Sequence, residues 1–89
     1  MKIMKNATAG TMESSDVYVE IEPGTNGIQL QLESVVAQQF GESIKAVVRE
    51  VLQEQGVEHA NVRVVDRGAL ECVIRARVET AVNRGKGNA

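Results

Sequence analysis

Two runs of alternating apolar and polar residues flank a short turn-forming segment in the first half of the chain. Residues 17–22 read VYVEIE and residues 28–33 read IQLQLE. A period of two is typical of strands that bury one face. The PGTNG segment at 23–27 consists of residue types that favour turns. We therefore expect the two runs to pair as an antiparallel hairpin.

After Ser34 the spacing of apolar residues changes from two to three and four. The positions concerned are Val36, Phe40, Ile44, Val47, Val48, Val51 and Leu52. This spacing predicts one apolar stripe on an amphipathic helix of about five to six turns. Ser34 is the expected N-cap of the helix, and Gly56 the expected residue just beyond its end.

A short strand and a second helix are expected in the last third of the chain. Val62 and Val64 predict the strand, and the DRG sequence at 66–68 predicts a tight corner. Residues 69–84 alternate like a strand as far as Val78, but they also carry a helical stripe. We favour the helix, because the stripe persists to Val82 and the alternation does not.

The order strand, strand, helix, strand, helix predicts a single α+β domain over residues 1–89. Its sheet is expected to be small and mostly antiparallel, with the helices packed on one face. Residues 1–16 show no strong period, and residues 85–89, GKGNA, are expected to form a disordered tail.

The composition argues against several functional classes. The chain has one Phe, one Tyr, no Trp and a formal net charge of -2, so it offers neither base-stacking platforms nor a field that attracts phosphates. We expect no nucleic-acid partner. No stretch approaches the roughly 20 apolar residues of a membrane span, so we also expect no membrane partner.

His59 and Cys72 are the sole members of their residue types. They cannot form a His/Cys metal cluster or an internal disulfide, so we expect no metal and a reducing, cytoplasmic location. Cys72 is expected in the core, although direct attachment of an acyl group to its thiol is an alternative. His59 is expected in a solvated loop, and no residue spacing supports a Ser-His-Asp triad.

The segment GTMESSD at 10–16 places two hydroxyl groups just ahead of the first alternating run. Serines in such positions usually form turn or cap hydrogen bonds. No base is positioned by sequence to activate either serine as a nucleophile. The alternative is that a separate enzyme attaches a phosphate-linked group to one of them.

The chain resembles the acyl carrier protein (gamma subunit) family of citrate lyase. The opening MKI and the AGTMESSD sequence at 9–16 match the start of that family, and QFG at 39–41 matches the start of its helix. Residues 66–79, DRGALECVIRARVE, match its second signature, with Arg67 where Lys is usual. The similarity covers essentially the whole chain.

The resemblance implies a non-catalytic carrier, modified on the serine that matches the family's attachment site. That residue is Ser14, since relatives can have Gly where this chain has Ser15. The prosthetic group is phosphoribosyl dephospho-coenzyme A, bound as a phosphodiester and ending in a thiol that holds acetyl and citryl thioesters. The implied partners are the alpha subunit, which exchanges acetyl for citrate, the beta subunit, which cleaves the citryl thioester to oxaloacetate, and the transferase that attaches the group.

Three other functions remain as alternatives. The chain could be the carrier subunit of malonate decarboxylase, an unmodified structural or interaction module, or a small standalone enzyme. Arg75 and Arg77 are interpreted as surface ion-pair residues, with contact to the phosphates of a cofactor as the alternative.

Overall fold

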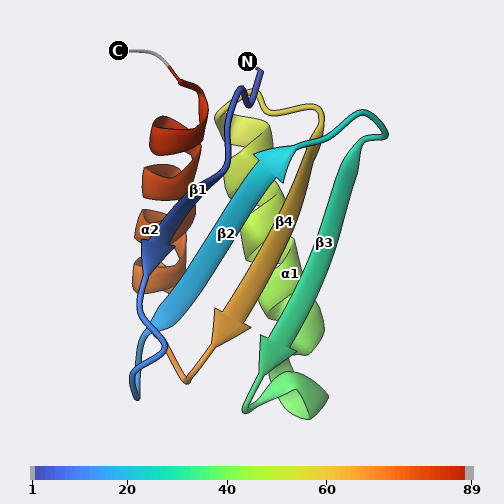
Figure 1. Ribbon diagram of the computed structural model, residues 1–89. Coiled ribbons are helices and arrows are strands. Elements are labelled where there is room, and N and C mark those ends of the chain that lie inside the picture. The colour runs from blue at the N-terminus through green and yellow to red at the C-terminus, as the bar shows by residue number, and fades with distance from the viewer. Residues whose placement is uncertain (1, 88–89) are drawn as a thin grey trace.

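Four strands and two helices form two layers in the computed structural model, which describes residues 2–87 (Figure 1). In chain order they are β1 (Ala7–Gly10), β2 (Val17–Pro23), β3 (Ile28–Ser34), α1 (Ala37–Glu54), β4 (Ala60–Asp66) and α2 (Glu71–Gly85). Both helices lie on the same face of the sheet. The predicted α+β class is therefore confirmed, and so is the helical interpretation of the last segment.

The strands are arranged in the order β1-β2-β4-β3. β2 is antiparallel to both β1 and β4, whereas β3 and β4 are parallel. The sheet is thus mostly antiparallel, as predicted. The predicted hairpin is wrong, however, because β4 lies between β2 and β3.

The connection between β2 and β3 is long enough to cross the end of β4. Four residues separate the two strands, and an extended link of this length spans up to about 17 Å, against about 10 Å for two strand spacings. A Cβ on Gly24 would lie 3.0 Å from backbone atoms of Ala60, so glycine permits this close crossing. The amide of Ala60 donates to the Gly27 carbonyl oxygen at 3.1 Å, which fixes the link to β4.

The start of α1 differs from the expectation. Ser34 is the last residue of β3, and α1 begins three residues later with Val36 at its N-cap position. The prediction of Ser34 as N-cap is wrong, although its Oγ does accept a hydrogen bond from the Val36 amide at 3.1 Å. Gly56 follows the C-cap residue with a φ of +75°, as predicted. Phe40 is 52% exposed and lies outside the core.

Cys72 is exposed on α2, so its predicted place in the core is wrong. Two positions along an α-helix correspond to about 200°, which turns Cys72 away from the buried Ile74. Gly85 ends α2 and is buried, and its carbonyl oxygen accepts hydrogen bonds from the amides of Met4 and Lys5. It does not belong to a disordered tail, and residues 88–89 of that predicted tail lie outside the described residues.

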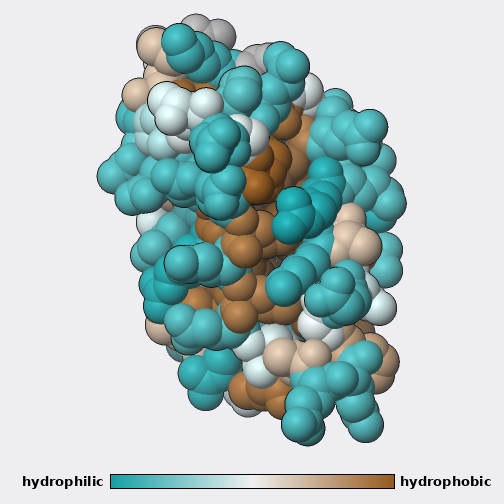
Figure 2. Space-filling view, turned by 90° about the vertical axis from the view of Figure 1, so that its right-hand side faces the viewer, coloured by the Kyte–Doolittle hydropathy of each residue, from teal (hydrophilic) through white to brown (hydrophobic). Residues whose placement is uncertain are grey.

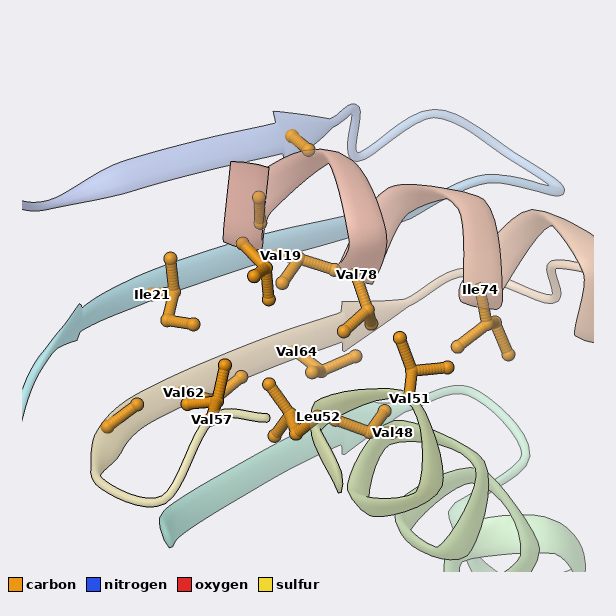
Figure 3. Close-up of a cluster of buried hydrophobic side chains, with 14 of the residues drawn as sticks. Val19, Ile21, Val48, Val51, Leu52, Val57, Val62, Val64, Ile74 and Val78 are labelled. Carbon is orange, nitrogen blue, oxygen red and sulfur yellow. The ribbon is translucent and has the colours of Figure 1, made fainter. Parts of the chain in front are cut away.

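Aliphatic side chains fill the space between the sheet and the helices (Figure 3). The main members of this hydrophobic core are Val17, Val19 and Ile21 of β2, Val62 and Val64 of β4, Val48, Val51 and Leu52 of α1, and Ile74, Val78 and Val82 of α2. The inward side chains of β3 are only half-buried, and Figure 2 shows a band of apolar surface on the side of β3 and α1. No helix within residues 2–87 is long and apolar enough to span a bilayer.

Candidate functional site

Residues 11–16 form the loop between β1 and β2, and the two serines lie in its turn. The amide of Asp16 donates to the carbonyl oxygen of Glu13 at 3.1 Å, which closes a turn around Ser14 and Ser15. Ser15 has a φ of +66°, the conformation that a type II turn requires at its third position. Ser14 is exposed, and its hydroxyl has no hydrogen-bond partner in the described part of the chain.

Asp16 holds the two ends of this loop together. Its Oδ2 accepts a hydrogen bond from the Thr11 hydroxyl at 2.6 Å, and its Oδ1 accepts one from the Val17 amide at 2.7 Å. Arg77 of α2 donates to both oxygens, from Nε at 3.2 Å and from Nη2 at 3.1 Å. A bidentate arginine pair of this kind is geometrically specific. It fixes the loop to a helix 61 residues away in sequence.

The same contacts stabilise the ionised form of Asp16. The hydrogen bonds from the Thr11 hydroxyl and the Val17 amide lower its pKa most, and Arg77 adds to the effect. Together they reduce the pKa of this carboxyl from 3.8 to about 2. The Asp16 side chain is only 16% exposed, so solvent screens its contact with Arg77 less than it would screen a pair on the open surface.

The base of the loop is fixed by its backbone. The Ser15 amide donates to the Arg67 carbonyl oxygen at 2.8 Å, and the Arg67 amide donates to the Asp16 carbonyl oxygen at 2.9 Å. Gly10, the last residue of β1, has a φ of +89°, and a Cβ at this position would lie 1.9 Å from the Val17 carbonyl oxygen. Only glycine fits at that point. Ser14 is therefore exposed at the tip of a loop whose base is constrained.

The arrangement does not activate Ser14 as a nucleophile. His59 precedes β4, whereas the loop lies beyond the other end of that strand, about 23 Å away at 3.3 Å per residue. His59 lies in a loop and is exposed, as predicted, and its Nδ1 accepts a hydrogen bond from the Gly27 amide at 2.9 Å. Chemically, the site offers an accessible hydroxyl to a reagent or enzyme that supplies its own base.

Arg75 and Arg77 both form ion pairs, in agreement with the favoured interpretation. Arg75 contacts Glu71 on its own helix, and Glu50 and Glu54 on α1. Arg77 contacts Asp16. Both guanidinium groups are thus paired with carboxylates. Arg75 joins α2 to α1, and Arg77 joins α2 to the loop.

Sequence reasoning missed two residues near this end of the sheet. Gly10 has no side chain for a sequence pattern to reveal, although its close approach to the Val17 carbonyl oxygen shapes the loop. Asp66 was assigned to a corner, but its side chain is 1% exposed and accepts hydrogen bonds from the Ser34 hydroxyl at 2.8 Å and the Ala69 amide at 3.0 Å. The available signal was the position of Asp66, an acidic residue at the end of an otherwise apolar strand and next to the predicted corner.

Sequence comparison finds close relatives of the chain. The family model for ACP, described as "Malonate decarboxylase delta subunit (MdcD)", matches residues 4–85. Citrate lyase acyl carrier protein 2 of Salmonella typhimurium is 59% identical over 85 residues, covering 94% of this chain and 88% of the relative. The citrate lyase acyl carrier proteins of Klebsiella pneumoniae and Lactiplantibacillus plantarum are 56% and 50% identical, with the same coverage.

A solved structure has the same fold. A chain in the crystal structure of a Pseudomonas malonate decarboxylase hetero-tetramer in complex with malonate superimposes with a TM-score of 0.77. The match covers 94% of this chain and 91% of that chain at 21% identity. At this identity the likeness shows a shared fold and nothing more.

Proposed function

The chain belongs to the family of citrate lyase acyl carrier proteins, and from this membership we propose that it carries acyl groups as thioesters on a prosthetic arm attached to Ser14. Its named relatives are acyl carrier proteins, so the chain is a carrier and not an enzyme. The proposed location is the cytoplasm, in keeping with the single cysteine.

The observation that carries the proposal is the setting of Ser14. A modifying enzyme needs a hydroxyl that it can reach and that stays in one place. Ser14 is exposed, its hydroxyl has no partner within residues 2–87, and contacts to Asp16 and Arg67 constrain the loop on either side. Ser15 is less suitable, because its amide is bound to Arg67 and its positive φ is one that glycine adopts more readily.

Phosphoribosyl dephospho-coenzyme A fits this setting. A phosphodiester needs only one hydroxyl from the protein, and the open position of Ser14 leaves room for a bulky group. When bound, the group supplies a thiol that activates acyl groups as thioesters. The chain then contributes the attachment point, a stable scaffold and surfaces for docking, and the tether keeps the acyl group at high effective concentration near its enzymes.

We further propose that the partners are the citrate lyase alpha and beta subunits and the transferase that attaches the arm. In this scheme the alpha subunit exchanges acetyl for citrate, and the beta subunit cleaves the citryl thioester to oxaloacetate. Identities of 50–59% to citrate lyase carriers support citrate over malonate as the substrate of the complex. The malonate decarboxylase description of the matching family model keeps a malonate-specific complex as the second candidate.

Intact-mass measurement tests the attachment. Protein isolated from its native host is expected to be heavier than its polypeptide by one phosphoribosyl dephospho-coenzyme A. The Ser14→Ala variant should lose this increment and the matched Ser15→Ala variant should keep it. A native protein with only its polypeptide mass, or an increment that survives Ser14→Ala, would overturn the proposal. Co-purification of the large subunits, followed by an assay for oxaloacetate formed from citrate, decides between citrate and malonate.

A further inference from the structure

A second feature lies at the same end of the sheet as Ser14. A cavity of about 320 Å³ opens between the first turns of α1 and α2 and the end of β4. Its apolar lining comes from Val36, Phe40, Ile44, Val47, Ala69 and Ile74. Figure 1 shows the start of both helices, the end of β4 and the loop of residues 11–16 together at this end of the molecule.

The cavity is within reach of Ser14. The Ser15 amide is bonded to the carbonyl oxygen of Arg67, and the next residue, Gly68, lines the cavity. Two Cα steps and one hydrogen-bonded crossing separate Ser14 from Gly68, a span of at most about 13 Å. An arm that contains two riboses, phosphates and a pantetheine in series exceeds this distance.

The polar groups of the cavity are acidic. Asp66 and Glu71 contribute carboxylates to its wall, and Ser43 contributes a hydroxyl. Glu71 is paired with Arg75, at 3.2 Å, so within the described part of the chain the cavity's unpaired acid is Asp66. Asp66 is 1% exposed and forms no ion pair with any described residue, and its two hydrogen bonds come from the neutral donors Ser34 and Ala69. A neutral apolar group is compatible with such a lining. A group that carries carboxylates meets the side chain of Asp66, which has no cationic partner among residues 2–87, next to apolar walls.

We propose that this cavity holds the acetyl thioester end of the arm and excludes the citryl thioester. The acetyl group is small and neutral, whereas a citryl thioester retains two free carboxylates. The cavity thus shields the resting acetyl group from water and leaves the citryl group exposed to a partner. The inference rests on the proposed function of Ser14, which supplies the tether.

Binding of free thioesters to the unmodified chain tests the cavity separately from the arm. Adding S-acetylpantetheine to ¹⁵N-labelled protein should shift the amide resonances of Ile44, Gly68 and Ile74. S-malonylpantetheine, which adds one carboxylate, should bind at least about tenfold more weakly. Shifts scattered over the surface, or equal binding of the two thioesters, would overturn the proposal.

Two variants and one control extend this test. Ala69→Leu places three additional carbon atoms in the cavity and should weaken binding of S-acetylpantetheine about tenfold, while Ala76→Leu adds the same volume on an exposed face of α2 and should leave it unchanged. If Ala69→Leu does not fold, Phe40→Ala removes an exposed wall of the cavity and should weaken binding in the same sense. Equal affinity in wild type, cavity variants and control would overturn the proposal.

The two proposals fail in different ways. An arm on Ser14, shown by intact mass, together with no binding in the cavity overturns the cavity proposal alone. Binding in the cavity without any arm on Ser14 overturns the carrier proposal, and with it the acetyl group as the natural occupant.

Discussion

Replacing Asp16 by Asn should destabilise the chain and remove part of its sensitivity to acid. Asn keeps the shape of the side chain but loses the charge that Arg77 neutralises. The pKa of Asp16 is about 2, against 3.8 for an unperturbed carboxyl, and a difference of about 1.8 pH units corresponds to about 2.4 kcal/mol. Arg77 is 40% exposed and solvent weakens its ion pair, so we expect a loss of about 1–2 kcal/mol.

The dependence on pH has a definite sign. The pKa of Asp16 is lower in the folded state, so its contribution to stability is complete only well above pH 3.8, and it is lost as the pH falls from there through about 2. The Asp16→Asn variant lacks this contribution at every pH. Its free energy of unfolding should therefore approach that of the wild type as the pH falls through this range.

Urea denaturation at neutral pH and at several values between pH 3.8 and 2 measures the free energy of unfolding, and thermal unfolding at neutral pH measures the melting temperature. At neutral pH the melting temperature of Asp16→Asn should fall by about 4–16 °C. Glu13→Gln removes an exposed carboxylate from the same loop that forms no ion pair within residues 2–87, and it should behave like the wild type. If wild type and Asp16→Asn lose stability in parallel as the pH falls, the assigned role of Asp16 is refuted.

Three other substitutions test the same end of the sheet. Ser15→Gly should raise the free energy of unfolding by about 0.5–1 kcal/mol, because glycine relieves the positive φ, and a lower urea midpoint would contradict this. Gly10→Ala should lower it by about 2 kcal/mol or more, because the new Cβ meets the Val17 carbonyl oxygen, and an unchanged urea midpoint would rule out the close contact. Ser34→Ala removes a hydrogen-bond donor from the buried Asp66 and should lower the free energy of unfolding by about 1–3 kcal/mol. An unchanged melting temperature would contradict this and would mean that solvent replaces the hydroxyl.

Periodicity in the sequence predicts which residues face the core. It is a poorer guide to which strands are neighbours in the sheet. The alternation in residues 17–22 and 28–33 correctly identifies two strands and, for β2, its buried face. Alternation contains no information about the strand next in the sheet, however. β4, one of the two partners of β2, begins 37 residues beyond the end of β2 and follows a helix, whereas the local turn residues favour a hairpin.

Short elements and long-range contacts also escape a local pattern. β1 has only four residues, ATAG, which contain no large apolar side chain and so produce no hydrophobic alternation. The match to a family motif favours Ser14 over Ser15, and the structure adds the exposure of Ser14 at the loop tip. The bond between Asp16 and Arg77 joins residues too far apart in sequence for spacing to reveal.

β4 lies between β2 and β3, so the sheet cannot form until most of the chain has been synthesised. Both β2 and β3 pair with this strand, which begins at Ala60, so neither can complete its hydrogen bonds while the earlier residues stand alone. Folds that depend on such distant pairings form slowly, and incomplete chains expose apolar surface. A fragment that ends before residue 60 should therefore remain unfolded.

Synthesis and loop formation are coupled for the same reason. The carboxylate of Asp16 receives its guanidinium partner only once residue 77 has been made and α2 has packed against the sheet. A nascent or truncated chain thus holds Ser14 in a loop without this restraint. An enzyme that recognises the ordered loop would thereby distinguish finished chains from unfinished ones.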